Sequence, residues 1–489
     1  MRTASVTADH SRGILLAEGA TGRPREQLLR ALEESRVAVS LDPEMPTSQL
    51  TTRVLLTTLR RGPGQLLLER SGLSARALDE LAEATEAIDP DRPVTVVKRI
   101  GGEFTARLHV GADTRRAVRV VPEGYGAHIA GQRTAVIRPT RPGNPVGAVY
   151  AAALGAAEAF KYTAHVLPHR RRLHRHLRFC PVTLSSRLAA APDLPSRQLL
   201  DLALIGVGAI GTGIVLLLNA MGAAGRLLAV DYQRFAPENR GMYSIGGAAE
   251  VRAAPWKTDM ARAALPRFDV IPFRELVDQL PAAIDARVVP WFPLVLTALD
   301  TAVGRRDAQR LWPDRLIDAA TGDTMLGMHD HEHGHGPCMT CFFPPERDGA
   351  SAAQRLADAT GLPLERTVLG ADPLTETDLV GLTEGQRHAL RPHVGTPVCG
   401  LAEAIGLTSL AASGYQPSIP FISLQAACLS VGRLIAVTFG ITPADNLVQY
   451  DGLFGPQAAT IERIKENPAC PCVSRSRTVD RVRETRRAG

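Results

Sequence analysis

One segment, residues 200–231, constrains the fold more than any other part of the chain. It has the pattern of a buried strand (DLALIG), a glycine-rich turn, an apolar helix and a second strand that ends at Asp231. Units of this kind build doubly wound parallel sheets. Residues 202–218 carry no charge, but their glycines and the following Asn219 favour this buried unit over a membrane span. We therefore predict an α/β fold with a doubly wound, Rossmann-like sheet.

The glycine-rich turn has the spacing of a phosphate-binding loop. Gly206, Gly208 and Gly211 form the pattern G-x-G-x-x-G. The first glycine permits the tight turn, the second lets the backbone approach a phosphate, and the third lets helix and strand pack closely. The helix N-terminus offers N–H groups and partial positive charge to an anion. Asp231 stands where a carboxylate accepts hydrogen bonds from ribose hydroxyls. Taken alone, this motif would suggest NAD, so an NAD- or FAD-dependent oxidoreductase is an alternative.

Charged residues further along the chain favour ATP instead. Arg240, Lys257 and Asp300 fall at predicted strand ends or in loops over the same crevice. The attack of a carboxylate on the α-phosphorus of ATP brings anions together. It therefore needs cations on the triphosphate and an acid that holds Mg²⁺. These three residues are of the types required, and an oxidoreductase has no need of all three together.

In these residues the chain resembles the ubiquitin-activating (UBA/ThiF-type) adenylyltransferases, clearly over residues 198–345 and more loosely over residues 395–473. In that family an Asn…Arg segment, a lysine and an Asp near a strand end follow the ribose-binding acid. The matching positions here are Asp231, Asn239, Arg240, Lys257, Asp300 and Arg305. The resemblance implies that Asp231 binds ribose and that Asp300 positions Mg²⁺. It also implies that Asn239, Arg240 and Lys257 engage the phosphates. One departure is that the Asn and the Arg are adjacent here, whereas family members usually have two residues between them.

Four of the seven cysteines come as two close pairs, Cys338 with Cys341 and Cys470 with Cys472. The pairs resemble the zinc site of the same family, although the second pair is spaced more tightly than usual. Four thiolates suit a closed tetrahedral Zn²⁺ site that joins distant segments. Unliganded thiols are the alternative. The histidine-rich tract 329–335 (HDHEHGH) is expected to be a mobile polar loop, and transition-metal binding is the alternative.

A fifth cysteine, Cys399, lies in a Gly/Pro-containing stretch between the two cysteine pairs. In the conjugating branch of the family, a cysteine in this region takes the activated carboxylate as a thioester. Such a nucleophile must be exposed and its thiolate favoured by its surroundings. The alternative for Cys399 is a small buried residue. We expect Cys180 and Cys428 to be structural.

The length of 489 residues predicts two or three domains. We place an N-terminal α/β domain at residues 1–165, a basic linker at 166–199, the adenylation domain with its zinc site at 200–473 and a basic tail at 474–489. In the first of these, strands are expected at 37–41, 65–68, 94–97 and 117–121, and a helix at 144–161.

A faint internal repeat links the two halves of the chain. Pro145 and Pro420 each begin an apolar, alanine-containing helix of similar pattern. The N-terminal domain is therefore either a degenerate copy of the adenylation domain or a peptide-binding unit, or the likeness is only that of two buried helices. It has no glycine-rich turn, so it is not expected to bind nucleotide itself.

The leading hypothesis is an enzyme that uses ATP to adenylate the C-terminal carboxylate of a small ubiquitin-like or sulfur-carrier protein, with a thioester on Cys399 as the following step. The alternatives are adenylation of a ribosomal precursor peptide in natural-product biosynthesis, the oxidoreductase named above, and a scaffold that keeps nucleotide and zinc without catalysis. The family resemblance implies a homodimer or an intrachain pseudo-dimer. The polar segment 1–18 does not favour a signal peptide, and we expect a cytoplasmic protein. The basic clusters at 170–178 and 475–487 lack interleaved aromatics, so solvated surface is favoured over nucleic-acid binding.

Overall fold

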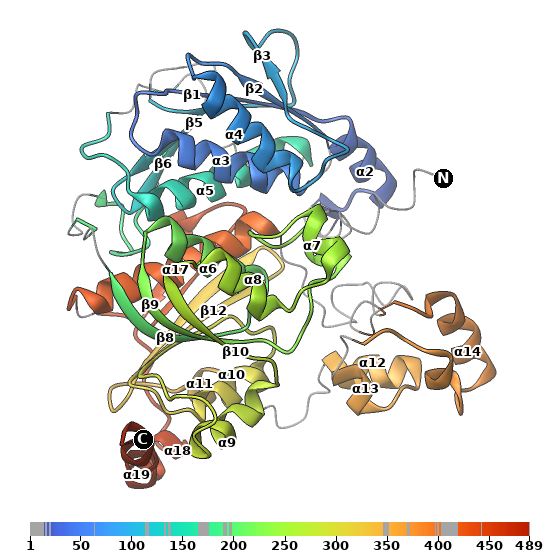
Figure 1. The fold of residues 1–489 in the computed structure, drawn as a ribbon, viewed down its shortest axis with the longest axis vertical. Helices are drawn as coiled ribbons and strands as arrows, with labels where there is room; N and C mark the ends of the chain where they lie inside the picture. Colours follow the sequence, from blue (N-terminus) through green and yellow to red (C-terminus); the bar gives the residue numbers. More distant parts are fainter. Residues whose placement is uncertain are drawn as a thin grey trace. The chain divides into compact units, whose positions relative to one another are not determined.

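The chain divides into two units (Figure 1). One unit comprises Met1–Pro344 and Ser418–Gly489 and contains two β-sheets, whereas the other comprises Pro345–Pro417. The computed structural model describes residues 14, 17–18, 21–62, 64–112, 117–131, 134, 138–164, 176–188, 193–194, 198–345, 352–368, 372–396, 398, 401, 419–441 and 443–488.

The C-terminal sheet has eight strands in the order β10-β9-β8-β11-β12-β13-β14-β15. The first five of these are parallel, and the last three run antiparallel to their neighbours. The bounds are β8 (Leu199–Ile205), β9 (Ala224–Val230), β10 (Phe268–Phe273), β11 (Leu294–Thr297), β12 (Arg315–Gly322), β13 (Met325–Glu332), β14 (Leu447–Asp451) and β15 (Thr460–Glu462).

The strand β8 shows why this sheet is covered on both faces. Leu202 and Leu204 lie in one hydrophobic core and Ala203 and Ile205 in another, because successive side chains of a strand point to opposite faces. Buried residues from the helices complete these two cores. The helices that follow the β8 strand are α6 (Ala209–Ala220), α7 (Ala248–Ala253), α8 (Lys257–Ala264), α9 (Leu280–Asp285), α10 (Ala302–Gln309), α11 (Met339–Phe342), α17 (Pro420–Thr438), α18 (Pro471–Ser474) and α19 (Ser476–Arg487). The doubly wound, Rossmann-like sheet predicted from the sequence is confirmed.

The N-terminal sheet has seven strands in the order β3-β2-β1-β4-β5-β6-β7. Its strands are β1 (Arg36–Leu41), β2 (Gln65–Glu69), β3 (Thr95–Val97), β4 (Ala106–Val110), β5 (Val118–Glu123), β6 (Gly126–Ala130) and β7 (His176–Phe179), and its helices are α2 (Arg25–Glu33), α3 (Ser48–Arg60), α4 (Ala75–Glu86) and α5 (Pro145–Thr163). Four strands and the long helix were expected from the sequence, whereas β4, β6 and β7 were not. The β7 strand lies inside the segment expected to be a linker, because Leu177 and Phe179 alternate with polar residues and are buried.

The two sheets are connected in the same way. Counted from the first strand of each, both follow the spatial order third, second, first, fourth, fifth, sixth, seventh, with the same parallel and antiparallel pairs. In both, a 19-residue helix that begins with proline joins the sixth strand to the seventh, namely α5 and α17. This match supports the interpretation of the N-terminal half as a copy of the C-terminal half.

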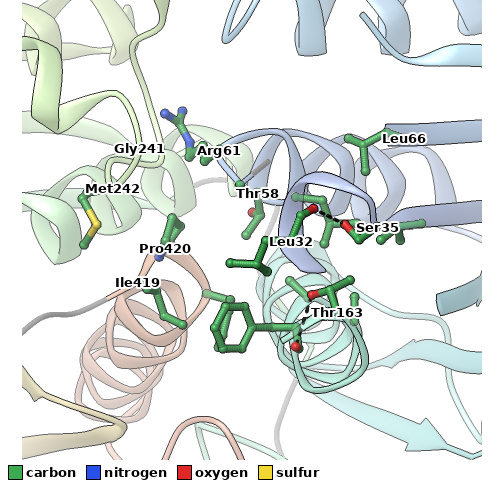
Figure 2. A pocket seen from close by; sticks show the side chains of 17 residues that line it. Leu32, Ser35, Thr58, Arg61, Leu66, Thr163, Gly241, Met242, Ile419 and Pro420 are labelled. Atoms are coloured by element: carbon green, nitrogen blue, oxygen red, sulfur yellow. Dashed lines mark hydrogen bonds between the residues drawn. The ribbon is translucent and has the colours of Figure 1, made fainter. Parts of the chain in front are cut away.

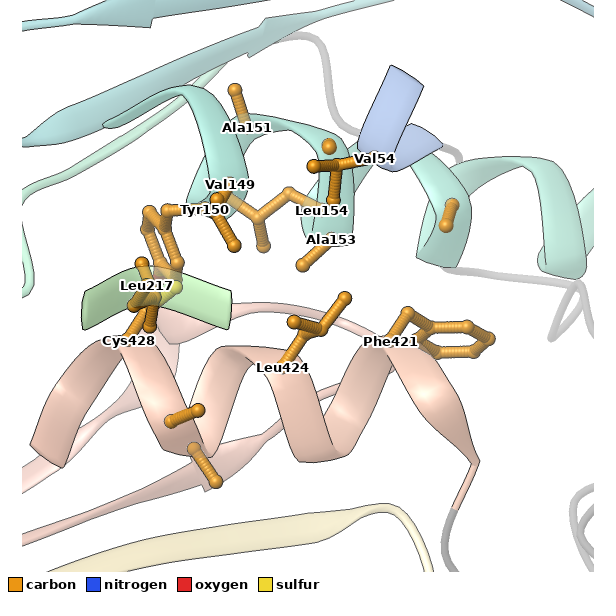
Figure 3. Packing of buried hydrophobic residues seen from close by; sticks show 14 of the residues in the cluster. Val54, Val149, Tyr150, Ala151, Ala153, Leu154, Leu217, Phe421, Leu424 and Cys428 are labelled. Carbon is orange, nitrogen blue, oxygen red and sulfur yellow. The ribbon is translucent and has the colours of Figure 1, made fainter. Parts of the chain in front are cut away.

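The two halves share one core, in which α5 and α17 pack against each other between the sheets (Figure 3). Phe160 contacts Phe421 with ring centroids 5.4 Å apart, and the hydroxyls of Tyr150 and Tyr450 lie 3.1 Å apart in the interior. The α17 helix is the one described helix with the length and hydrophobicity of a membrane span, and its side chains are almost all buried. We interpret it as a core helix.

The second unit is a small helical insertion between α11 and α17. It contains α12 (Ala352–Thr360), α13 (Leu364–Val368) and α14 (Glu384–Leu390) around its own hydrophobic core. Leucines 356, 362, 374, 379, 382 and 390 form most of that core. The Arg366 guanidinium binds Asp378 through two hydrogen bonds of 2.8 Å and closes the unit on itself.

The basic C-terminal tail folds as α19, in which most side chains are exposed, as expected, whereas Val479, Arg483 and Arg486 are buried. The Arg486 guanidinium donates to both carboxylate oxygens of Asp285 at 2.7 and 3.1 Å, and Arg483 pairs with Asp314. Both arginine side chains are largely buried. The tail is therefore ordered by acidic residues that lie far away in the sequence.

Candidate nucleotide site and thiolate cluster

The glycine turn after β8 has the geometry that its motif requires. Gly206 adopts a φ of +92°, and its N–H donates to the Val230 carbonyl at 2.8 Å. A Cβ added to Gly206 would lie 2.6 Å from the Ala298 carbonyl oxygen, and one added to Gly211 would lie 2.0 Å from the Gly206 oxygen. At Gly208 the nearest neighbour would be the Tyr243 hydroxyl at 3.9 Å. Two glycines are thus required by close packing, and the middle one leaves space beside the start of α6.

Asp231, at the end of β9, is held beside this turn. Its Oδ2 accepts a hydrogen bond from the Val207 N–H and its Oδ1 one from the Gln233 N–H, both at 2.9 Å. An ionised carboxylate has about four acceptor positions, so two further hydrogen bonds can be accepted. The structure therefore fixes the orientation of the Asp231 carboxylate and keeps acceptor capacity for hydroxyl groups.

Lys257, the first residue of α8, lies in the same cluster. Its side chain is buried, its Nζ donates to the Gln233 side-chain oxygen, and it lies 5.2 Å from the centroid of the Tyr243 ring. Burial acts to lower the pKa of Lys257, but Tyr243 and the Asp231 carboxylate outweigh it and raise the pKa above its ordinary value. The amine is therefore held charged beside Asp231. We call Gly208, Asp231, Gln233, Tyr243 and Lys257 the crevice cluster.

Asp300 follows the end of β11 and is exposed. Burial, and then the carboxylates of Asp300 and Asp231, raise the pKa of Tyr232. Parallel strands β8, β9 and β11 end at the same edge of the sheet. The structure therefore brings together Gly206, Gly208, Gly211, Asp231, Lys257 and Asp300 at this edge.

Two other predicted site residues make contacts that hold the fold. The Asn239 side chain accepts from the Ala236 N–H at 2.9 Å and closes a helical turn. Arg305 is buried, where its Nε lies 3.2 Å from Asp318 and its Nη2 donates to the Leu299 carbonyl at 2.5 Å. Arg305 thereby supports the residue directly before Asp300. A role in nucleotide binding stays a prediction for Asn239 and Arg305.

Arg240 lies at the junction of the two halves. It lines a small cavity together with Arg60, Arg61, Asp89 and other residues of the N-terminal half. Its backbone carbonyl accepts a hydrogen bond from the Arg61 guanidinium. Its expected contact with phosphates stays a prediction, and its neighbours from the N-terminal half were not foreseen.

The four paired cysteines converge although Cys338 and Cys470 are 132 positions apart in the sequence and Cys341 and Cys472 are 131 positions apart. The Sγ atoms of Cys338, Cys341, Cys470 and Cys472 all lie within 4.8 Å of one another. Cys338 lies 3.4 Å from Cys470, Cys341 lies 3.6 Å from Cys472, and Cys338 lies 3.9 Å from Cys341. In a tetrahedral site with Zn–S bonds of about 2.3 Å, sulfur atoms lie about 3.8 Å apart. Four thiolates at this spacing fit a Zn²⁺ ion, so the tighter Cys-x-Cys pair does not prevent the cluster.

The histidine tract is not the mobile loop that we expected, because residues 329–332 belong to β13 and pair with β12, and His329 also pairs with β14. His329 lies 3.1 Å from Asp318, the Nδ1 of His331 lies 3.1 Å from the Pro337 carbonyl, and His333 lies 2.8 Å from Asp480 of α19. Burial lowers the pKa of His331 to about 4.

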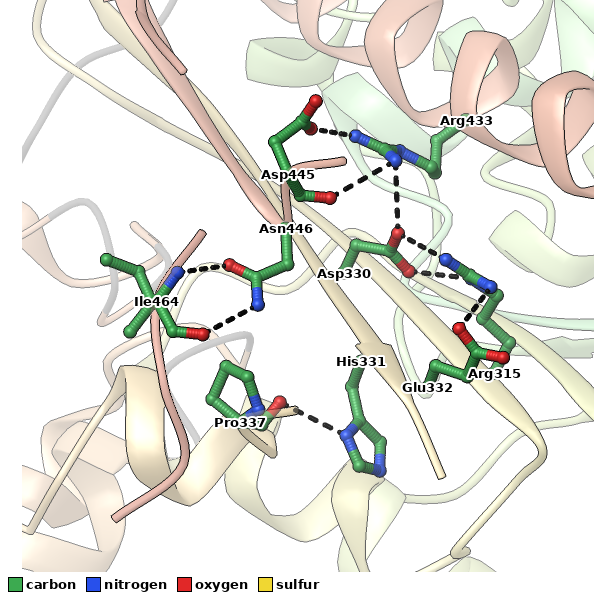
Figure 4. Close-up of polar contacts among 9 residues, drawn as sticks. All are labelled: Arg315, Asp330, His331, Glu332, Pro337, Arg433, Asp445, Asn446 and Ile464. Atoms are coloured by element: carbon green, nitrogen blue, oxygen red, sulfur yellow. Dashed lines mark hydrogen bonds and ion pairs between the residues drawn. The ribbon is translucent and has the colours of Figure 1, made fainter. Parts of the chain in front are cut away.

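Charge pairing explains why such a polar sequence can form a central strand. Asp330, the residue between two of these histidines, is buried and accepts two hydrogen bonds from Arg315 at 2.8 and 2.7 Å, and it pairs with Arg433 of α17 at 3.4 Å (Figure 4). Arg433 also binds Asp445, and Arg315 also binds Glu332. Each buried charge is thus compensated within a connected network.

Cys399 lies outside the described residues. Cys180 and Cys428 are fully buried, as expected for structural cysteines, and burial raises the pKa of the Cys428 thiol. Sequence reasoning missed Gln233 and Tyr243, which contact Lys257, and Tyr232, whose hydroxyl accepts a hydrogen bond from Gln233. The position of Gln233, two residues after Asp231, was the only signal for any of them, because the glycine motif says nothing about side chains that fold over it.

The fold and the site together define an α/β protein with a Rossmann-like glycine turn and a cluster of four cysteines. No known family model matches the chain. It is 27% identical over 351 residues to the uncharacterized protein y4jF of Sinorhizobium fredii (strain NBRC 101917 / NGR234), a similarity that covers 68% of this chain and 65% of that protein. The chain thus spans about two thirds of the length of this relative.

Solved structures of E. coli MccB are also similar. One is 12% identical, covers 56% of this chain and 64% of its own, and has a TM-score of 0.36. Another, of MccB with AMPCPP and MccA, is 11% identical, covers 55% and 65%, and has a TM-score of 0.35. Similarity at this level carries no argument about what this chain binds.

Proposed function

We propose that this protein is an ATP-dependent adenylyltransferase that activates a carboxylate. A carboxylate oxygen attacks the α-phosphorus of ATP, the bond to the bridging oxygen breaks, and pyrophosphate leaves with that electron pair. The product is a mixed anhydride, which a nucleophile can attack. The observation that carries this proposal is the crevice cluster, in which a glycine turn, a fixed carboxylate and a buried cation meet at one sheet edge.

The roles of the residues follow from that arrangement. The N–H groups at the start of α6 and the charged Lys257 would stabilise negative charge on the phosphates. Asp231 would accept hydrogen bonds from the ribose hydroxyls, and the exposed carboxylate of Asp300 would hold Mg²⁺. Arg240 would add a second cation. Zn²⁺ bound by the four cysteines would join α11 to α18 and take no part in the reaction.

The activated carboxylate, in this proposal, is the C-terminus of a small ubiquitin-like or sulfur-carrier protein. A ribosomal precursor peptide is the second candidate, and Cys399 is the proposed acceptor if a thioester follows. The N-terminal half takes the place of a second core, so that one chain forms a pseudo-dimer. The shared core of α5 and α17 and the equal connectivity of the two sheets support this part of the proposal.

Pyrophosphate exchange tests the proposal. The full chain, incubated with ATP, Mg²⁺, labelled pyrophosphate and a candidate carboxylate partner, should incorporate label into ATP only when the partner is present. Removing the amine in Lys257→Gln or the metal-binding acid in Asp300→Asn should lower the exchange rate at least tenfold. Asp269→Asn, which changes an exposed carboxylate of β10, is the matched control and should retain the rate.

Nucleotide binding separates this proposal from the oxidoreductase and scaffold alternatives. Titration calorimetry with ATP and with NAD, each with Mg²⁺, should show binding of ATP alone. A protein that binds NAD and ignores ATP is not an adenylyltransferase. A protein that binds ATP but exchanges no pyrophosphate with any carrier protein or precursor peptide tested would favour the scaffold.

A further inference from the structure

A connecting segment, residues 240–248, joins η2 (Pro237–Asn239) to α7 and reaches the nucleotide site through Tyr243. Residues 240–247 of this segment form neither helix nor strand. Tyr243 is buried, and the centroid of its ring lies 5.2 Å from the Lys257 Nζ. The Tyr243 hydroxyl is also the atom nearest to an added Cβ on Gly208, at 3.9 Å. The phenol therefore stands beside both the glycine turn and the amine of the crevice cluster.

The N-terminal half holds this connecting segment near both of its ends. Arg61, which directly follows α3, is 4% exposed. Its guanidinium donates one hydrogen bond to the Arg240 carbonyl and another, of 3.1 Å, to the Gly246 carbonyl. The Ala248 N–H donates to the Ala87 carbonyl at 3.0 Å. The middle of the segment, which enters the crevice cluster, is thus anchored to residues of the other half.

Close packing contributes little to the position of this backbone on one side. A chamber of about 90 Å³ lies between α2, α3, α5 and the start of α17, and Arg61, Gly241 and Met242 are among the residues that line it (Figure 2). A cavity offers no atoms to contact, so the segment depends here on its hydrogen bonds. A guanidinium suits this task because its planar fork holds several donors in fixed directions and can bind two carbonyls at once.

We infer that Arg61 is a positioning residue of the nucleotide site, and that it acts by keeping the Tyr243 hydroxyl beside the glycine turn. There the phenol O–H donates a hydrogen bond to a phosphate oxygen. The position fits this role because the middle glycine, Gly208, is where the backbone leaves room for a phosphate. The inference rests on the proposed ATP-dependent function and adds that the N-terminal half supports the nucleotide site through hydrogen bonds to its backbone.

Titration calorimetry with ATP and Mg²⁺ on the full chain tests the inference. Tyr243→Phe removes the hydroxyl and keeps the ring, so ATP binding should weaken at least about fivefold. Arg61→Met removes both hydrogen bonds to the connecting segment and should weaken ATP binding to a similar extent.

Arg60→Met is the matched control, because Arg60 is also buried, precedes Arg61 and loses the same charge. Its guanidinium donates to carbonyls that all belong to the N-terminal half, those of Gly62, Gly64 and Arg92. Arg60→Met should therefore lower the melting temperature and keep the wild-type affinity for ATP.

A double variant shows whether Arg61 acts through Tyr243. Arg61→Met added to Tyr243→Phe should weaken ATP binding by less than about twofold beyond Tyr243→Phe alone, because the hydroxyl that Arg61 positions is already missing. Thermal unfolding checks that each variant folds. If Arg61→Met does not fold, Arg61→Lys takes its place, since it keeps the charge but lacks the fork that holds two carbonyls.

The outcomes separate this inference from the proposed function. A wild-type chain that does not bind ATP overturns both. If the wild-type chain binds ATP, the inference alone is wrong when the folded Arg61 variant keeps the wild-type affinity, when Arg60→Met weakens binding as much, or when the effects of the Arg61 and Tyr243 substitutions add.

Discussion

Alanine substitutions at two glycines of the turn should separate ATP binding from stability. Gly208→Ala should mainly weaken ATP binding, whereas Gly211→Ala should mainly lower the free energy of unfolding. At Gly208 the backbone is extended, with a φ of −84°, and the added methyl group would meet only the Tyr243 hydroxyl at 3.9 Å. Gly208 caps α6, so Gly208→Ala should cost at most about 1 kcal/mol of folding free energy. The methyl group would, however, occupy the space that a phosphate needs. ATP binding should weaken at least tenfold, which corresponds to about 1.4 kcal/mol.

At Gly211 an added methyl group should mainly affect stability. An added Cβ would lie 2.0 Å from the Gly206 oxygen and 3.0 Å from its carbonyl carbon, both of which are backbone atoms. The helix α6 would have to move away from β8, and overpacking of this kind costs about 1–3 kcal/mol. Gly211→Ala should therefore lower the free energy of unfolding by that amount.

Chemical denaturation and ATP titration of both variants provide the measurement. Gly101→Ala is the control, because its added Cβ meets nothing within 4 Å. The reasoning is refuted if Gly208→Ala binds ATP as tightly as the wild-type protein, or if Gly211→Ala is as stable as the control. The first result would mean that the turn does not hold a phosphate. The second would mean that the close packing at Gly211 does not limit stability.

Three further predictions concern other parts of the protein. Cys338→Ser should abolish the binding of one zinc ion per chain, measured by elemental analysis, and lower the melting temperature, whereas Cys428→Ala, outside the cluster, should retain the zinc. Asp330→Asn should lower the free energy of unfolding, measured with denaturant, by about 3–5 kcal/mol, because two buried guanidinium groups lose their shared carboxylate. Glu332→Gln is the control: the Glu332 side chain is 45% exposed, so the loss should be less than about 1 kcal/mol. Equal losses in the two variants would contradict the role assigned to Asp330. Burial and the charge of Arg178 lower the pKa of His128 to about 4 in the folded protein. The histidine of the unfolded chain keeps the ordinary pKa of about 6.5, so below that pH the unfolded state binds more protons than the folded state. The free energy of unfolding should therefore fall as the pH decreases. Between pH 6.5 and 5 this loss should be about 2 kcal/mol, measured by denaturation at each pH, and His128→Gln should remove that part of the dependence.

Local patterns along the chain were sufficient for much of the C-terminal half. The β8 strand, the glycine turn and the β9 strand could be predicted because their periodicity and glycine spacing are determined by neighbouring residues. The cysteine pairs could be recognised because metal ligands occur at short spacings. By contrast, β4 and β6 were missed, because short buried strands of the N-terminal sheet contain residues such as Arg107 and His128 that weaken the apolar signal.

Ion pairs between residues far apart in the chain allow two charged segments to fold in ways that the sequence did not predict. The tract 329–335 reads as a polar loop, yet Arg315 and Arg433, from elsewhere in the chain, neutralise Asp330 and allow a buried strand. The basic tail becomes a docked helix for the same reason, since Asp285 and Asp314 receive its arginines. The sequence by itself determined where the glycine-rich turn and the cysteine pairs occur. Only the tertiary structure decided which charges are paired, that two similarly connected sheets share one core, and that Arg61 meets Arg240, because these depend on contacts between residues far apart in the chain.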